Sequence, residues 1–270
     1  MALIKNMSLI EKQIISHLIS GVKKVMPNVM SNLKTEHSWV LKKRNKNFIT
    51  PPPSCFKFHR WAASLKSSQA FAYNIFSGVK NVKFEVPMQV IDRPAEMDVI
   101  VEDTNTLHLY EVKFTEFTKN DKIDFKESYF DVNNYILSSK EVANQYKKFI
   151  KKVIKHFDNK KIYGTGIKQL CSHLLGILTE LEKNNYFADK KIILYSLCFD
   201  YEISPKFNKY LEEYKIVLEE FKKYVIEFLI DINFEHKVEY FGFLSASKFI
   251  KDNKKSIGDA NYNYIKQRYF

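Results

Sequence analysis

One stretch of sequence decides the fold: Met97-Asp-Val-Ile-Val-Glu-Asp-Thr-Asn-Thr-Leu-His-Leu-Tyr-Glu-Val-Lys-Phe114. Its two apolar halves flank the polar segment 102–106, which is short enough for a hairpin turn. We therefore predict two antiparallel strands on either side of this segment. If Glu102 pairs with Leu107 across the turn, the register of the whole hairpin follows, because each further pair comes in order along both strands.

That register brings three charged side chains together at one end of an apolar sheet. It places Asp98 opposite Glu111, with the two Cβ atoms about 5 Å apart. Lys113 shares a strand face with Glu111 because side chains alternate along a strand. Charges in apolar surroundings are costly unless they are paired or bind an ion. Two carboxylates at this spacing suit Mg²⁺, or Mn²⁺ in its place, and we expect Asp98 and Glu111 to be the ligands.

The chemistry expected of this group is the hydrolysis of a phosphodiester bond. A divalent ion lowers the pKa of a bound water, and a neighbouring ammonium orients that water or offsets charge on the phosphate. The pattern of an acid, any residue and Lys occurs eight times in the chain, so it predicts nothing alone. Its occurrence at Glu111 differs because an acid-bearing strand precedes it across a hairpin. An exposed ion cluster at a sheet edge is the structural alternative.

Further elements follow from hydrophobic periodicity along the rest of the chain. Three strands in succession are followed by alternating helices and strands. This order predicts an α/β (α+β) fold with a mixed sheet covered by helices. We expect a single domain overall, in which residues 1–54 form an N-terminal helical and basic arm to residues 55–270. The predicted helices are 8–25, 61–76, 139–157, 166–183 and 205–233, and the predicted strands are 83–90, 97–101, 107–114, 191–199 and 238–244.

Composition narrows the class of partner. The 270 residues contain 43 Lys and Arg against 31 Asp and Glu, a net charge of +12, which favours a polyanionic partner, nucleic acid first. We see no apolar run of membrane-spanning length and no signal peptide, and expect no membrane partner. Three widely spaced cysteines, Cys55, Cys171 and Cys198, argue against a disulfide framework and fit a cytoplasmic location.

The hairpin residues and two further segments resemble motifs of a known protein family. Pro94-Ala-Glu-Met-Asp98 followed by Glu111-Val-Lys113 resembles the signature of the PD-(D/E)xK nuclease superfamily. Two further segments resemble motifs of its bacterial restriction-endonuclease-like proteins: Ser67-Ser-Gln-Ala-Phe-Ala-Tyr-Asn74 and Lys168-Gln-Leu-Cys-Ser-His-Leu-Leu-Gly176. The resemblance covers about residues 55–200. It implies a core of order α-β-β-β-α-β with a helical N-terminal extension, a helical insert and a C-terminal helix and strand.

The resemblance also implies roles for individual residues. Asp98 and Glu111 would hold Mg²⁺, and Lys113 would assist the attacking water. Gln69, on the first core helix, would lie where the superfamily places an acid or amide beside the metal. Gln169 would be the supporting polar residue on the helix after the third strand.

Several residues near the motif have competing interpretations. The Pro-Asp pair of the superfamily is stretched here, which leaves Glu96 as a rival ligand on the strand face of Asp98. Glu85 on the first strand is a candidate third carboxylate or an ordinary strand-edge acid. Ser68, with its neighbour Ser67, is a candidate phosphate contact or a local backbone cap. His173 has no partner four residues later on its helix, so we do not expect it to be a ligand.

A basic helix face completes the prediction. Its five lysines recur at helical spacing and are either a solvated face or a DNA-binding surface: Lys147, Lys148, Lys151, Lys152 and Lys155. Phenylalanine and tyrosine side chains are expected mostly in the core. Together these features predict a Mg²⁺-dependent endonuclease acting on DNA, of restriction type and as a homodimer. The alternatives are a catalytically inactive DNA-binding protein of nuclease fold, a repair or recombination nuclease, and a basic membrane-surface or scaffold protein.

Overall fold

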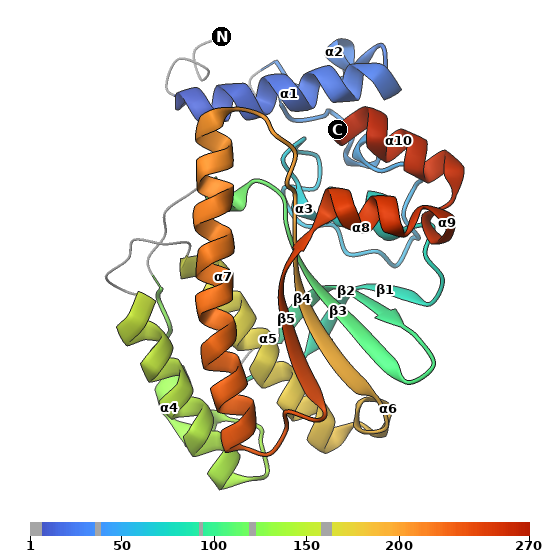
Figure 1. Ribbon diagram of the computed structural model, residues 1–270. Helices are drawn as coiled ribbons and strands as arrows, with labels where there is room; N and C mark the ends of the chain where they lie inside the picture. Colours follow the sequence, from blue (N-terminus) through green and yellow to red (C-terminus); the bar gives the residue numbers. More distant parts are fainter. Residues whose placement is uncertain (1–6, 36–38, 92–93, 119–122, 158–163) are drawn as a thin grey trace.

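The computed structural model describes residues 7–35, 39–91, 94–118, 123–157 and 164–270. These residues form a five-stranded mixed sheet in the order β1-β2-β3-β4-β5 (Figure 1). The first three strands are antiparallel neighbours, whereas β4 runs parallel to β3 and β5 parallel to β4. The predicted α/β class with a mixed sheet is confirmed. The strands are β1 (Val82–Met88), β2 (Ala95–Glu102), β3 (Thr106–Lys113), β4 (Lys191–Cys198) and β5 (Val238–Ser245).

The hairpin of β2 and β3 has the predicted register. Glu102 pairs with Leu107, and the ladder continues to Val99 opposite Tyr110. β1 is an edge strand, as Pro87 within it predicts, because proline lacks the N–H that an inner ladder requires. β3 is the middle strand of the sheet, so its side chains are buried along most of its length.

Helices cover both faces of the sheet (Figure 1). On one face α5 approaches β1 so closely that a Cβ on Gly176 would lie 2.9 Å from that of Met88, which explains the glycine. On the other face the rings of Phe76 in α3 and Phe249 in α8 pack on Tyr110. The helices are α1 (Leu9–Val25), α2 (Val29–Asn32), α3 (Ser68–Phe76), α4 (Lys140–Phe157), α5 (Gly164–Lys183), α6 (Asn185–Ala188), α7 (Pro205–Asp231), α8 (Ala246–Asp252), α9 (Lys254–Ile257) and α10 (Asp259–Tyr269).

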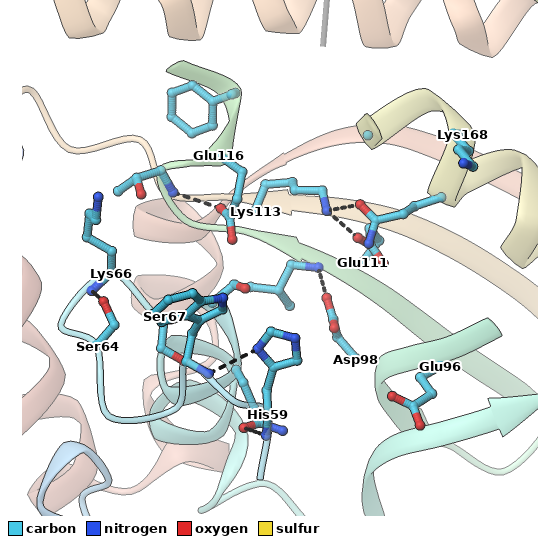
Figure 2. A pocket seen from close by; sticks show the side chains of 18 of the residues that line it. His59, Ser64, Lys66, Ser67, Glu96, Asp98, Glu111, Lys113, Glu116 and Lys168 are labelled. Carbon is cyan, nitrogen blue, oxygen red and sulfur yellow. Dashed lines mark hydrogen bonds and ion pairs between the residues drawn. The ribbon is translucent and has the colours of Figure 1, made fainter. Parts of the chain in front are cut away.

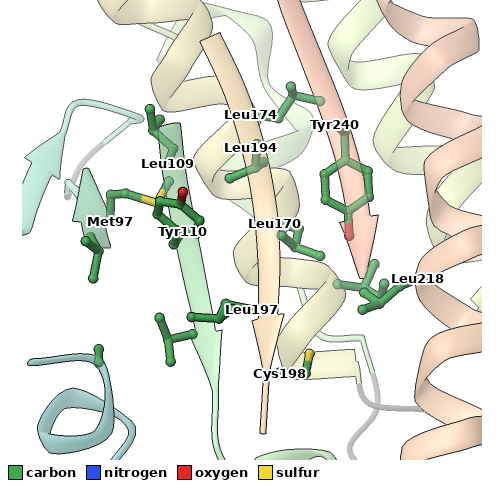
Figure 3. Packing of buried hydrophobic residues seen from close by; sticks show 14 of the residues in the cluster. Met97, Leu109, Tyr110, Leu170, Leu174, Leu194, Leu197, Cys198, Leu218 and Tyr240 are labelled. Carbon is green, nitrogen blue, oxygen red and sulfur yellow. The ribbon is translucent and has the colours of Figure 1, made fainter. Parts of the chain in front are cut away.

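The main core lies between the sheet and the helices α5 and α7 (Figure 3). Leu109 of β3 pairs with Leu194 of β4, and both belong to one buried cluster with Leu170 of α5, Leu218 of α7 and Tyr240 of β5. α4 packs outside α7, where the rings of Phe149 and Phe228 stack 4.8 Å apart. No helix in the described part of the chain is both long and apolar enough to cross a membrane.

The N-terminal segment joins the same core. α1 begins with a reciprocal cap, in which Ser8 and Glu11 satisfy each other's backbone N–H groups. Its buried residues, Ile14 and Leu18 among them, belong to the hydrophobic cluster that contains the sheet. α1 runs beside α10, and the end of α10 lies against the middle of α1, where His17 Nε2 is 2.9 Å from the carbonyl oxygen of Tyr269 (Figure 1).

Two sequence predictions about elements are wrong. The helix predicted over Trp61–Phe76 begins only at Ser68, because the Ser67 side chain caps it by accepting from the N–H of Ala70. The chain also does not end with a helix and a strand, since three further helices follow β5. α10 escaped the periodicity because it buries a charged residue, Arg268, whose guanidinium donates to Asn47.

Candidate functional site

Three carboxylates lie in a row across β1, β2 and β3. The paired register of β2 and β3 ends at Val99 and Tyr110, and Asp98 and Glu111 are the next residues along the two strands. On β1, Glu85 occupies the position across from Asp98, between two regular pairs of the ladder. Glu85 has a left-handed backbone, with a φ of 51°, and it interrupts the ladder there. Glu85, the candidate third carboxylate, is therefore adjacent to Asp98 and Glu111.

Glu111 is the most tightly held of the three acids. Its Oε1 accepts from Lys113 Nζ at 2.5 Å, and its Oε2 lies 2.5 Å from Nε2 of His173 on α5. Only 1% of Glu111 is exposed. Burial alone would raise the pKa of Glu111, but the charges of Lys113 and His173 outweigh it and bring the pKa to about 2. Glu111 is therefore ionised throughout the neutral range.

Lys113 carries its charge in a buried position. Burial would lower the pKa of its ammonium, but the carboxylates of Glu111, Glu116 and Asp98 outweigh burial and raise the pKa above its usual value. Nζ also donates to Oε1 of Gln169 on α5 at 2.6 Å. Lys113 is thus a protonated donor at neutral pH, fixed between a carboxylate and an amide (Figure 2).

Asp98 differs from Glu111 and Lys113, because its surroundings disfavour its charged form. Its Oδ2 accepts from the backbone N–H of Val112 at 2.7 Å. Burial and the negative charge of Glu111 raise the pKa of Asp98 well above its usual value, against the lowering effects of Lys113 and of this hydrogen bond. Ionised Asp98 is therefore unfavourable here unless a further positive charge is present.

The surroundings of Glu85 also disfavour its ionised form. Burial, followed by repulsion from Glu96 and Glu111, raises the pKa of Glu85 to about 7, although a hydrogen bond with Gln69 lowers it. Between pH 4.5 and pH 7 the unfolded chain releases the Glu85 proton, whereas the folded protein still holds it. The free energy of unfolding therefore falls as the pH rises from 4.5 towards 7.

Replacing Glu85 with Gln should remove this loss. We expect Glu85→Gln to raise the melting temperature by about 2–4 °C for each kcal/mol gained at pH 8, and to leave it unchanged at pH 4. Thermal unfolding of both proteins at the two pH values measures the effect. An equal difference at pH 4 and pH 8 would contradict the assignment of a raised pKa to Glu85.

Gln69 mainly anchors the N-terminal loop. Its Oε1 accepts from the N–H of His59 at 2.9 Å, and its Nε2 donates to the carbonyl of Lys57 at 2.8 Å. It also lines the cavity and contacts Glu85. The structure therefore places Gln69 beside the acidic row, with both ends of its amide engaged by the loop.

All eight candidate ligands and supporting residues line one cavity of about 930 Å³: Ser68, Gln69, Glu85, Glu96, Asp98, Glu111, Lys113 and Gln169. Glu96 is exposed and lies apart from Asp98 in Figure 2, whereas Asp98 points towards β3. None of the five lysines of α4 lines this cavity, and one of them, Lys152, pairs with Glu227 of α7.

The sequence does not predict a role for His173 as a ligand, but the structure places this residue at the centre of the site. It is 2% exposed and contacts Glu111, while its Nδ1 is buried without a hydrogen-bond partner among the described residues. A signal was present in the sequence: His173 follows Gln169 by four residues, so both point from the same face of α5.

The donor chemistry fits a divalent cation. The described residues hold no ready group of three or more His, Cys, Asp or Glu side chains for a metal. Mg²⁺ does not require one, because it keeps several waters and binds proteins through one or two carboxylates. Asp98 and Glu111 are donors of this kind, and the raised pKa of Asp98, from burial and negative neighbours, is what a cation would relieve.

Comparisons with protein-family models, with curated proteins and with solved structures each gave no match to this chain.

Proposed function

We propose that this protein is a Mg²⁺-dependent endonuclease of the PD-(D/E)xK type that hydrolyses phosphodiester bonds in DNA. One observation carries the proposal: Asp98, Glu111 and Lys113 come from a hairpin of the predicted register and line one cavity. The element order α3-β1-β2-β3, then α5-β4 after the inserted α4, agrees with the core that the resemblance implies.

The roles of the residues follow from their charges. Asp98 and Glu111 would hold the cation, which supplies Lewis-acid polarisation of the phosphate and a more acidic water. Lys113 is held protonated, so it would orient the attacking water and offset charge on the phosphate as a donor, and it would not act as the base. Gln169 and His173 keep Lys113 and Glu111 in place. Gln69 positions the loop beside them.

DNA outside the cavity would meet positive charge. The exposed lysines of α4 offer a surface for backbone phosphates, and the net charge of +12 favours such binding. We propose restriction-type cleavage of duplex DNA by a homodimer, with one such site for each strand.

The test is incubation of the purified protein with supercoiled plasmid. Nicked and linear products should form with Mg²⁺ or Mn²⁺ and should be absent in EDTA. Gel-shift measurements on the same plasmid separate binding from cleavage. An intact plasmid under every metal condition would refute the nuclease proposal.

A specific observation favours a second candidate, a DNA-binding protein that keeps the nuclease fold without turnover. Both carboxylate oxygens of Glu111 are already engaged, one by Lys113 and the other by His173. A self-satisfied ion cluster needs no metal to be stable in the fold. This candidate predicts gel shifts without cleavage, and shifts that are unaffected by EDTA.

A further inference from the structure

Aromatic side chains line the cavity together with Glu85, Asp98 and Glu111. The chain has only two tryptophans, and both of them, Trp39 and Trp61, line this cavity together with His59. We call these three residues the aromatic wall. Trp61 is 55% exposed, whereas most phenylalanine and tyrosine rings of the chain belong to the core.

The aromatic wall is held in place by the backbone. The segments 39–41 and 63–65 are joined by hydrogen bonds from Leu65 N–H to the Trp39 carbonyl and from Leu41 N–H to the Ala63 carbonyl, both 2.9 Å. Gln69 holds the backbone of His59, as described above. The backbone segments that carry the rings are therefore held in place before any ligand binds, which lowers the entropy cost of binding.

Positively charged side chains lie over the two tryptophan rings. The Arg60 guanidinium lies 5.4 Å from the centre of the Trp61 ring, and Lys66 Nζ lies 5.8 Å from that of Trp39. Lys126 and Lys168 also line the cavity. Rings that alternate with cations match a single nucleic-acid strand, because bases stack on the rings while phosphates meet the cations.

Stacking on these rings requires an unpaired base. The cavity of about 930 Å³ is at the upper end of the range for small-ligand pockets, roughly 300–1,000 Å³. In a duplex both faces of a base are covered by its neighbours, so a tryptophan can stack only on a base that has left the helix. Such a base would enter the cavity that both the aromatic wall and the Asp98–Glu111 pair line.

We propose that the aromatic wall binds an unpaired nucleobase, so that this site binds a single strand or an unpaired strand end more tightly than an intact duplex, whose cleavage requires a base to leave the helix. The inference rests on the proposed nuclease function for the class of ligand. It deepens that function by naming the form of nucleic acid that enters the cavity.

Tryptophan emission tests this inference directly, because both tryptophans line the cavity. In EDTA, a short oligothymidylate should quench the emission of the wild-type protein and saturate. A blunt duplex of the same length should quench it only at several-fold higher concentration. Equal affinity for the two DNAs, or no quenching by the oligothymidylate, would overturn the inference.

Variants identify the ring responsible, with the anisotropy of a labelled oligothymidylate as the readout. Trp61→Leu should weaken binding by between roughly fivefold and a hundredfold, the usual contribution of one stacked base. Trp61→Phe should retain most of the affinity. Phe241→Leu is the matched control, since Phe241 is exposed on β5 and does not line the cavity. Wild-type affinity in Trp61→Leu would overturn the assignment.

The two proposals fail separately. A protein that cleaves plasmid but is not quenched by the oligothymidylate keeps the nuclease function and loses the aromatic wall as a base site. A protein that is quenched but never cleaves keeps the base site and loses the nuclease function.

Discussion

Asp98→Asn is expected to lose plasmid cleavage by at least about a hundredfold while the protein stays folded. The amide keeps an oxygen for the hydrogen bond from Val112 N–H, so the hairpin is preserved. It removes the negative charge that the proposed cation requires. Lys113→Met is expected to lose activity by roughly 10²–10⁴-fold, because it removes the buried donor beside the cation site. Initial rates of nicking at saturating Mg²⁺ measure both effects.

Glu96 provides the matched control for this prediction. It lies on the same strand as Asp98, two residues earlier, and is exposed at the edge of the cavity. Glu96→Gln should therefore cleave within about threefold of the wild-type rate. If Glu96→Gln is inactive and Asp98→Asn is active, the rival ligand is the correct one and the assignment of Asp98 is wrong.

The second large effect is a pair of stability changes of opposite sign. Lys113→Met should lower the free energy of unfolding by about 3–5 kcal/mol, the usual cost of breaking a buried ion pair. The reason is that Glu111 is 1% exposed and would keep its charge in the apolar site with His173 as its remaining partner. Asp98→Asn should instead stabilise the protein, because burial and Glu111 raise the pKa of Asp98 and make its ionised form unfavourable.

The pH dependence distinguishes this explanation from a packing effect. The folded protein binds the Asp98 proton more tightly than the unfolded chain does, so the penalty begins above the usual value of 3.8 and grows as pH rises towards the raised pKa. The gain in Asp98→Asn should thus be larger at pH 8 than at pH 5 in urea unfolding. A gain that is independent of pH, or a loss, would show that Asp98 is not electrostatically strained.

The hairpin could be predicted from sequence because its information is local. A five-residue polar segment between two apolar runs leaves few registers, and the one chosen pairs Glu102 with Leu107 as observed. The family resemblance implies only a supporting role for Gln169, and its contact with Lys113 was not predicted, because the two residues are 56 positions apart with α4 inserted between them. Local spacing carries no information about such a distant contact.

The N-terminal half of the site was harder to predict for a different reason. Trp61 lies in an apolar-looking run that favours a helix, but the cap at Ser67 shortens that helix and leaves Trp61 in a turn. The turn is held by the amide of Gln69, a single side chain with no periodic signal. Exposure of Trp61 is therefore a tertiary property that a helical pattern conceals.

The most direct test of the central claim is the position of a divalent ion in crystals soaked with Mn²⁺. Anomalous scattering should give one peak bonded to carboxylate oxygens of both Asp98 and Glu111, and Asp98→Asn crystals soaked in the same way should lack it. A wild-type crystal with no peak at these two carboxylates, or with its peak on Glu96 alone, would contradict the account.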